Sequence, residues 1–141
     1  MFSLAPEEGV DIVFLTIEQI DYFHELALKE GGLAGNLKTD DLKSAIGRPM
    51  TAHHFGGICD LLNLAARYWH GISIAHGYCD ANKRTAFISA IAFLEANGIE
   101  IDESVSSGEP GRFIEEQFQA GTFTVEVLEQ YLRTRCRWIE E

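Results

Sequence analysis

Residues 85–97 read TAFISAIAFLEAN, and this stretch decides the predicted fold. Its apolar side chains would face nearly every side of a helix, which is typical of a helix enclosed by other helices. Asn97 and Gly98 provide a helix stop at its end. The sequence therefore predicts an all-α fold in which about six helices pack around the segment 85–97.

The flanking sequence provides the other helices of this fold. Thr16 followed by Gln19 forms a capping box, and Thr39 and Thr124 are good N-cap residues. Apolar residues then recur at helical spacing, whereas strand-like alternation is scarce. The predicted helices cover residues 17–29, 40–47, 58–71, 85–97, 110–120 and 125–132, with a loop at 48–57 and one candidate strand at 99–101.

The length and the cysteine count favour one ordinary domain. The chain has 141 residues, three prolines and no internal repeat, so we expect a single domain over residues 1–141. Cys59, Cys79 and Cys136 are an odd number of cysteines without the spacing of metal ligands. We expect reduced thiols in core or boundary positions.

The charge of the chain argues against nucleic acid and membrane surfaces as partners. Against 22 acidic residues stand 11 basic ones, a formal net charge of −11, which repels phosphates and anionic lipids. The longest nearly uncharged run, residues 85–94, is far shorter than the roughly 18 to 20 apolar residues of a membrane span. Residues 1–10 do not show the order of a secretory signal, so we expect a cytoplasmic protein.

One segment departs from this acidic background. Residues 81–94 contain no acidic residue and two basic ones, Lys83 and Arg84, at a predicted helix start. Unpaired N–H groups and the helix dipole favour an anion there, so Ala81, Asn82, Lys83 and Arg84 form a candidate phosphate site.

The residues just before this site add two more chemical groups. His76 can take a proton near neutral pH, and Asp80 is a hard oxygen ligand suited to Mg²⁺. Taken singly, His76 is more often a satisfied polar group and Asp80 a helix cap. Lys83 and Arg84 are more often a solvated first turn. Together the residues combine a base, a metal ligand and a phosphate cradle, which indicates nucleotide chemistry.

Residues 76–86, HGYCDANKRTA, resemble the signature of the Fic/Doc family in its Doc-type (death-on-curing toxin) form. Three further segments are similar to the corresponding parts of Doc-type proteins. They are GGLAG at 31–35, the stretch 42–49 and FLEANG at 93–98. The resemblance covers about residues 14–132, which we expect to be the core of the domain.

The resemblance implies an all-α Fic fold and a role for each motif residue. His76 would be the base that takes the proton of a target hydroxyl, Asp80 the Mg²⁺ ligand, and Asn82 and Arg84 phosphate-binding residues. Lys83 stands where the AMP-transferring branch has glycine, and in Doc-type members this lysine is thought to fill part of the phosphate cradle. ATP would then bind reversed and present its γ-phosphate.

The same resemblance implies a target and a partner. Doc-type proteins phosphorylate a threonine of translation elongation factor Tu and stop protein synthesis. The chain has no match to the family's self-inhibitory helix, so we expect a separate antitoxin of the Phd type, with a tail that folds on binding.

The segment 49–55 precedes the predicted third helix and, by resemblance, corresponds to the flap that docks the target peptide. We therefore expect target docking by Ala52, His53, His54 and Phe55. A metal site at the two adjacent histidines is the alternative, but a zinc site needs three or four ligands and no second pair is visible.

Two other functions stay open. The same site could transfer AMP instead of phosphate, and the chain could be a non-catalytic module that binds nucleotide or antitoxin. Arg133, Arg135 and Arg137 could suggest a nucleic-acid patch, but cations suit the end of a helix and acidic neighbours dilute their field.

Overall fold

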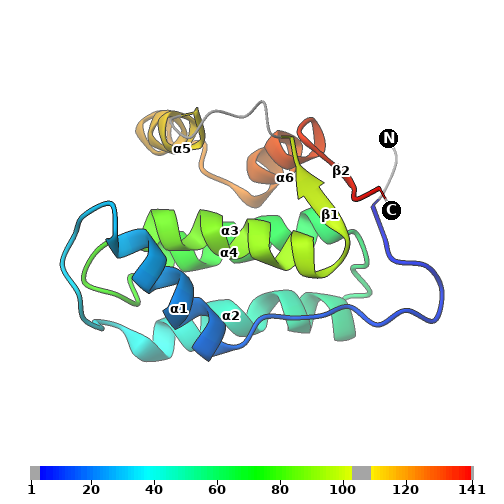
Figure 1. Cartoon of the computed structure of the whole chain (residues 1–141), viewed down its shortest axis with the longest axis horizontal. Coiled ribbons are helices and arrows are strands. Elements are labelled where there is room, and N and C mark those ends of the chain that lie inside the picture. Colours follow the sequence, from blue (N-terminus) through cyan, green and yellow to red (C-terminus); the bar gives the residue numbers. More distant parts are fainter. Residues whose placement is uncertain (1–3, 103–108, 141) are drawn as a thin grey trace.

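The computed structural model describes residues 4–102 and 109–140. Within them the chain is predominantly helical, so the predicted all-α class is confirmed (Figure 1). The elements in chain order are α1 (Ile17–Leu28), α2 (Thr39–His54), α3 (Leu61–Ala75), α4 (Asn82–Ala96), β1 (Ile99–Ile101), α5 (Glu109–Ala120), α6 (Val125–Arg133) and β2 (Cys136–Trp138).

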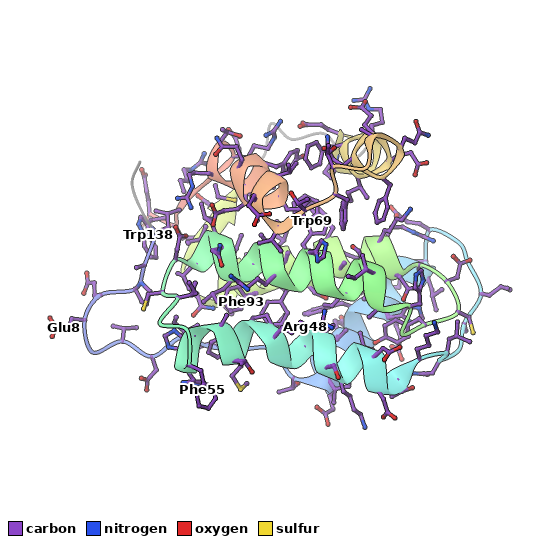
Figure 2. The ribbon with its side chains drawn as sticks, turned by 180° about the vertical axis from the view of Figure 1, so that it is seen from behind. Glu8, Arg48, Phe55, Trp69, Phe93 and Trp138 are labelled. Carbon is purple, nitrogen blue, oxygen red and sulfur yellow. The ribbon has the colours of Figure 1, made fainter. Side chains whose placement is uncertain are left out.

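Helices α3 and α4 form the centre of the molecule. Figure 1 shows them side by side, with α1 and α2 on one side and α5 and α6 on the other. Phe93 of α4 and Tyr68 and Trp69 of α3 are fully buried, and the Tyr68 and Phe93 ring centroids lie 5.0 Å apart. Figure 2 shows Trp69 and Phe93 pointing into the interior. The predicted central segment, residues 85–97, thus lies in the centre of the fold together with α3.

Two helix ends lie further along the chain than predicted. Helix α3 continues past Gly71 to Ala75, because this glycine serves close packing: a Cβ there would lie 3.3 Å from the Ala45 Cβ of α2. Helix α2 continues to His54, so the predicted loop at 48–57 is wrong. The buried Pro49 lies inside α2, where proline removes one backbone hydrogen bond without ending this helix.

The predicted strand at 99–101 is present and pairs with a strand that was not predicted. β1 and β2 are antiparallel, with Ile99 opposite Trp138 and Ile101 opposite Cys136. The three residues of β2 are too few to show a strand period, so their sequence carried no signal.

The expected burial of the cysteines is wrong for two of the three. Cys59 and Cys79 are exposed, and Cys136 is partly buried. Burial raises the pKa of the Cys136 thiol to about 12, which keeps it protonated.

The C-terminal arginines pair with acidic side chains that lie far from them in the sequence. Arg133 lies 2.7 Å from Asp60. Arg135 lies 2.8 Å from Glu109. None of the helices in the described ranges is long and apolar enough to cross a membrane.

Candidate functional site

The loop between α3 and α4, residues 76–81, carries the site; we call it the motif loop. His76 begins it with φ 53° and Ala81 ends it with φ 63°. They are the only non-glycine residues with positive φ among those described. Such backbone strain costs about 1 to 2 kcal/mol per residue and is common at functional sites.

A cavity of about 380 Å³ lies at the motif loop; we call it the motif pocket. It collects every residue that the sequence assigned to catalysis, metal and phosphate. Cys79 of the motif also lines it, as does Ser73, which the sequence did not single out. The lining residues are Ser73, His76, Cys79, Asp80, Ala81, Asn82, Lys83 and Arg84.

The start of α4 faces this pocket without a side-chain cap. Ala81 is the N-cap residue and makes no side-chain hydrogen bond. The first N–H groups of α4 therefore lack the usual capping partner, and the positive end of the helix dipole lies at the same place. This arrangement suits a bound phosphate.

Asp80 is exposed, and it accepts two backbone hydrogen bonds. Its Oδ1 accepts from Ala81 N at 2.8 Å, and its Oδ2 accepts from Leu33 N at 3.2 Å. These bonds, first from Ala81 and then from Leu33, lower the pKa of the Asp80 carboxyl below its ordinary value. Asp80 is therefore a carboxylate at neutral pH, as a metal ligand must be.

The donor set at Asp80 fits magnesium better than zinc. No group of three or more His, Cys, Asp or Glu side chains suited to a metal occurs among residues 4–102 and 109–140. Mg²⁺ is usually held by one or two carboxylates together with substrate phosphates and water. A single exposed carboxylate beside a phosphate site meets that description.

Asn82 stabilises the motif loop. Its Oδ1 accepts from Tyr78 N at 3.1 Å, and its Nδ2 donates to Tyr78 O at 3.0 Å. The amide is thus bonded to both backbone polar groups of one loop residue. Its expected role in phosphate binding remains a prediction.

Lys83 and Arg84 reach in opposite directions from the start of α4. The Lys83 ammonium lies 4.1 Å from the centroid of the Phe118 ring and 4.0 Å from Glu115 on α5. Arg84 donates to the carbonyls of Ala27, in α1, and of Gly31, just after it. Both bonds are 2.7 Å long. The two cations therefore span the distance between α5 and α1.

Side chains of helix α1 also contact and stabilise the motif loop. The His24 ring stacks on the Tyr78 ring with centroids 3.7 Å apart, and its Nε2 lies 3.0 Å from the Asp80 carbonyl oxygen. The Tyr78 hydroxyl donates to Asp21. His24 is buried, so it packs under the motif loop and does not face solvent.

The segment expected to form a flap does not lie near the motif pocket. Lys38 N donates to His76 O where α2 begins, but Ala52, His53 and His54 form the last turn of α2, and Phe55 follows it. At 1.5 Å per residue this separation is about 20 Å. Figure 2 shows Phe55 at the end of α2, pointing outward.

The segment that does border the motif loop is residues 31–38, between α1 and α2; we call it the bordering loop. Leu37 N donates to Gly77 O, and Cys79 N donates to Gly35 O. Leu33 and Leu37 are 73% and 62% exposed. The bordering loop therefore presents exposed apolar side chains beside the motif loop, where they could contact another protein. Docking of a target by Ala52, His53, His54 and Phe55 remains a prediction.

Comparison with known proteins agrees with this geometry. The model of the Fic/DOC family matches residues 14–94, more than half of the chain. The chain is 33% identical over 88 residues to "Protein kinase doc" of Escherichia phage P1. The aligned region covers 62% of this chain and 70% of that protein. The motif pocket lies within the matched residues.

Proposed function

The chain belongs to the Fic/DOC family, and from this membership we propose that it transfers the γ-phosphate of ATP to a hydroxyl group of a target protein. The observation that carries the proposal is the motif pocket. It brings His76, Asp80, Lys83 and Arg84 to the uncapped start of α4. The relative named as a protein kinase supports phosphate as the transferred group.

His76 would act as the general base. Its imidazole is exposed at the pocket, and its backbone is fixed by the bond from Lys38 N to His76 O at 3.2 Å. In the proposed step the hydroxyl oxygen of the target attacks the γ-phosphorus as its proton passes to His76. The bond to the β,γ-bridging oxygen breaks, and ADP leaves. Such a base contributes about 10²–10⁴ in rate.

The phosphates would be bound by the start of α4 and by the two cations. Asp80 would hold Mg²⁺, which offsets phosphate charge when it is bound. The N–H groups of the first turn would bind phosphate oxygens, and Lys83 and Arg84 would add positive charge. Arg84 keeps N–H donors beyond the two used on the carbonyls of Ala27 and Gly31, because a guanidinium carries five.

The target and the partner are proposed on the family resemblance. We infer a threonine of translation elongation factor Tu as the acceptor, and a Phd-like antitoxin as the inhibitor. The bordering loop, with exposed Leu33 and Leu37, would contact the target. The chain's net charge of −11 favours a partner surface with basic residues.

Labelled ATP tests the proposal. The protein is incubated with elongation factor Tu and ATP labelled at the α- or the γ-phosphate, and the target is then weighed by mass spectrometry. We expect γ-label and the added mass of one phosphoryl group. The α-label and the mass of AMP would instead indicate an AMP-transferase, and no modification of any protein in a bacterial extract would indicate a binding module.

The variant His76→Asn tests the role of His76 as the base. Asparagine tolerates the left-handed backbone at this position, so this variant removes the base without adding strain. It should bind ATP like the unaltered protein and lose transfer by about 100-fold or more. Unchanged labelling of the target by this variant would contradict the role of His76.

A further inference from the structure

Two side chains of α5 contact the ammonium group of Lys83. The Glu115 Oε2 lies 4.0 Å from the Lys83 Nζ, and the centroid of the Phe118 ring lies 4.1 Å from it. Glu115 and Phe118 are three positions apart in α5, so they lie on the same face of this helix. One cation thus lies between a carboxylate and the face of an aromatic ring, and both attract it.

Neighbouring side chains hold both of these α5 residues in place. The Glu115 Oε1 accepts a hydrogen bond of 3.3 Å from the Gln119 Nε2. The Phe118 ring stacks on the Phe123 ring with centroids 4.2 Å apart, and both rings pack against the core. The place that receives the ammonium is therefore fixed by α5 and by the residues just after it.

The side chain of Lys83 also borders the motif pocket. Lys83 is the second residue of α4, and it lines the pocket together with His76 and Asp80. Its side chain is 46% exposed. The four-carbon chain of a lysine is flexible, so the ammonium can turn from α5 towards the motif pocket without movement of the helix.

The charge at the start of α4 decides which of the two places the ammonium takes. Without a bound anion, the positive end of the helix dipole disfavours a cation in the first turn, and Glu115 and Phe118 attract the ammonium away from it. A phosphate bound at the helix start reverses the sign of the local charge. Such a phosphate competes with Glu115 and Phe118 for the ammonium of Lys83.

We propose that Glu115 and Phe118 are positioning residues: they hold Lys83 at α5 until a bound polyphosphate draws its ammonium into the motif pocket. This inference rests on the proposed function and specifies how α5 sets the affinity for ATP. Binding must break both contacts, so the affinity is lower than the motif would give without them. Helix α5 lies beyond residues 14–94, where the family match ends.

Calorimetry with Mg²⁺ and ATP tests the role of Glu115. Glu115→Gln keeps the shape of the side chain and removes its charge, so it should tighten ATP binding about 3-fold, as expected for loss of an exposed ion pair. Glu116→Gln is the matched control, because Glu116 is the exposed neighbour on α5. It should change the affinity by less than about 1.5-fold. Unchanged or weaker ATP binding in Glu115→Gln would overturn the proposal.

The role of Phe118 is tested in the same way. Phe118→Leu removes the ring face and should tighten ATP binding about 2-fold, whereas Phe118→Tyr keeps the face and should bind ATP like the unaltered protein. Thermal unfolding checks that each variant folds. Equal ATP affinities of the leucine and tyrosine variants would contradict a role of the ring.

A double-mutant cycle separates release of Lys83 from direct repulsion between Glu115 and phosphate. In the Lys83→Met background, Glu115→Gln should leave the ATP affinity unchanged, because no ammonium remains to be released. The same gain in both backgrounds would show that Glu115 repels phosphate directly, and it would overturn the positioning role.

Nuclear magnetic resonance of lysine labelled with ¹³C at the ε-carbon follows the ammonium itself. The Phe118 ring should shift the Lys83 ε-proton signal upfield in the ATP-free protein, and Lys83→Met identifies this signal. Addition of Mg²⁺ and inorganic triphosphate should remove the shift. An upfield shift that persists at saturating triphosphate, or that is absent beforehand, would overturn the proposal.

The two proposals fail separately. Release of Lys83 by triphosphate without transfer of phosphate to any protein would contradict the proposed function and support the positioning role. Transfer of γ-phosphate with unchanged ATP affinity in Glu115→Gln would do the reverse. If the unaltered protein bound neither ATP nor triphosphate, both would be overturned.

Discussion

The Tyr78 hydroxyl donates a 2.5 Å hydrogen bond to Asp21 and so ties the motif loop to α1. The ring of Tyr78 is buried and stacked on His24, while Asp21 lies at the surface. Burial and the bond to Asp21 raise the pKa of this hydroxyl. A buried hydroxyl bonded to a carboxylate stabilises a fold more than a neutral pair does.

Tyr78→Phe should therefore lower the free energy of unfolding by about 1 to 2 kcal/mol, because it removes the bond and keeps the ring. Urea denaturation measures the loss. Tyr22→Phe is the matched control, since Tyr22 follows Asp21 on α1 and is 56% exposed. It should change stability by less than about 0.5 kcal/mol. Equal effects of the two changes would show that the bond to Asp21 adds no stability.

Tyr68 makes stability sensitive to alkaline pH. It is fully buried in α3, and burial raises its pKa to about 12 against a small opposing effect of the Leu15 N–H bond. The unfolded chain releases this proton near pH 10, so the stabilising effect is complete below that pH. It is lost as the pH rises towards about 12.

We therefore expect the free energy of unfolding to fall as the pH rises from about 10 to about 12. Denaturation in urea at several alkaline pH values measures this slope. Tyr68→Phe should reduce stability at neutral pH, because Leu15 N loses its acceptor, but it should make the alkaline slope shallower. An unaltered slope in this variant would exclude Tyr68 as its source.

Asp80→Asn tests the proposed Mg²⁺ site with little change of side-chain shape. An asparagine oxygen can still accept from Ala81 N or Leu33 N, but it carries no charge for Mg²⁺. Transfer should fall at least about 100-fold, and ATP affinity should no longer rise with Mg²⁺ concentration. Asp41→Asn, in the first turn of α2, is the control and should leave both properties unchanged. Persistent Mg²⁺ dependence in Asp80→Asn would contradict a metal role.

The central helix and the motif could be predicted from the sequence because both signals are local. The segment 85–97 is apolar on nearly all sides, and the motif residues follow one another in the chain. The capping box of Thr16 and Gln19 is likewise local and is present. In each of these cases the information lies within about four helical turns of sequence.

The parts that could not be predicted depend on distant contacts. Gly71 looks like a helix stop, but it lies inside α3 because Ala45 of another helix packs against it. Pro49 looks like a helix breaker, yet α2 continues through it. Because α2 runs without a break from Thr39 to His54, Phe55 lies at the end of α2 that is far from the motif loop. The sequence singled out the residues that line the motif pocket, but it did not single out the loop that borders them.

The last prediction concerns target docking by the bordering loop. Under the proposed function, Leu33→Asp and Leu37→Asp should each lower transfer to the target about 10-fold, because an exposed apolar contact of about 1 to 2 kcal/mol is lost. For Leu37→Asp the ATP affinity should stay unchanged, since the Leu37 side chain does not line the motif pocket. Phe55→Asp is the control: it is 89% exposed, but it lies at the other end of α2. Kinetics with varied target concentration distinguish docking at the bordering loop from docking at the end of α2, because loss of a docking contact raises KM for the target. A rise in KM for Phe55→Asp alone would return target docking to the end of α2.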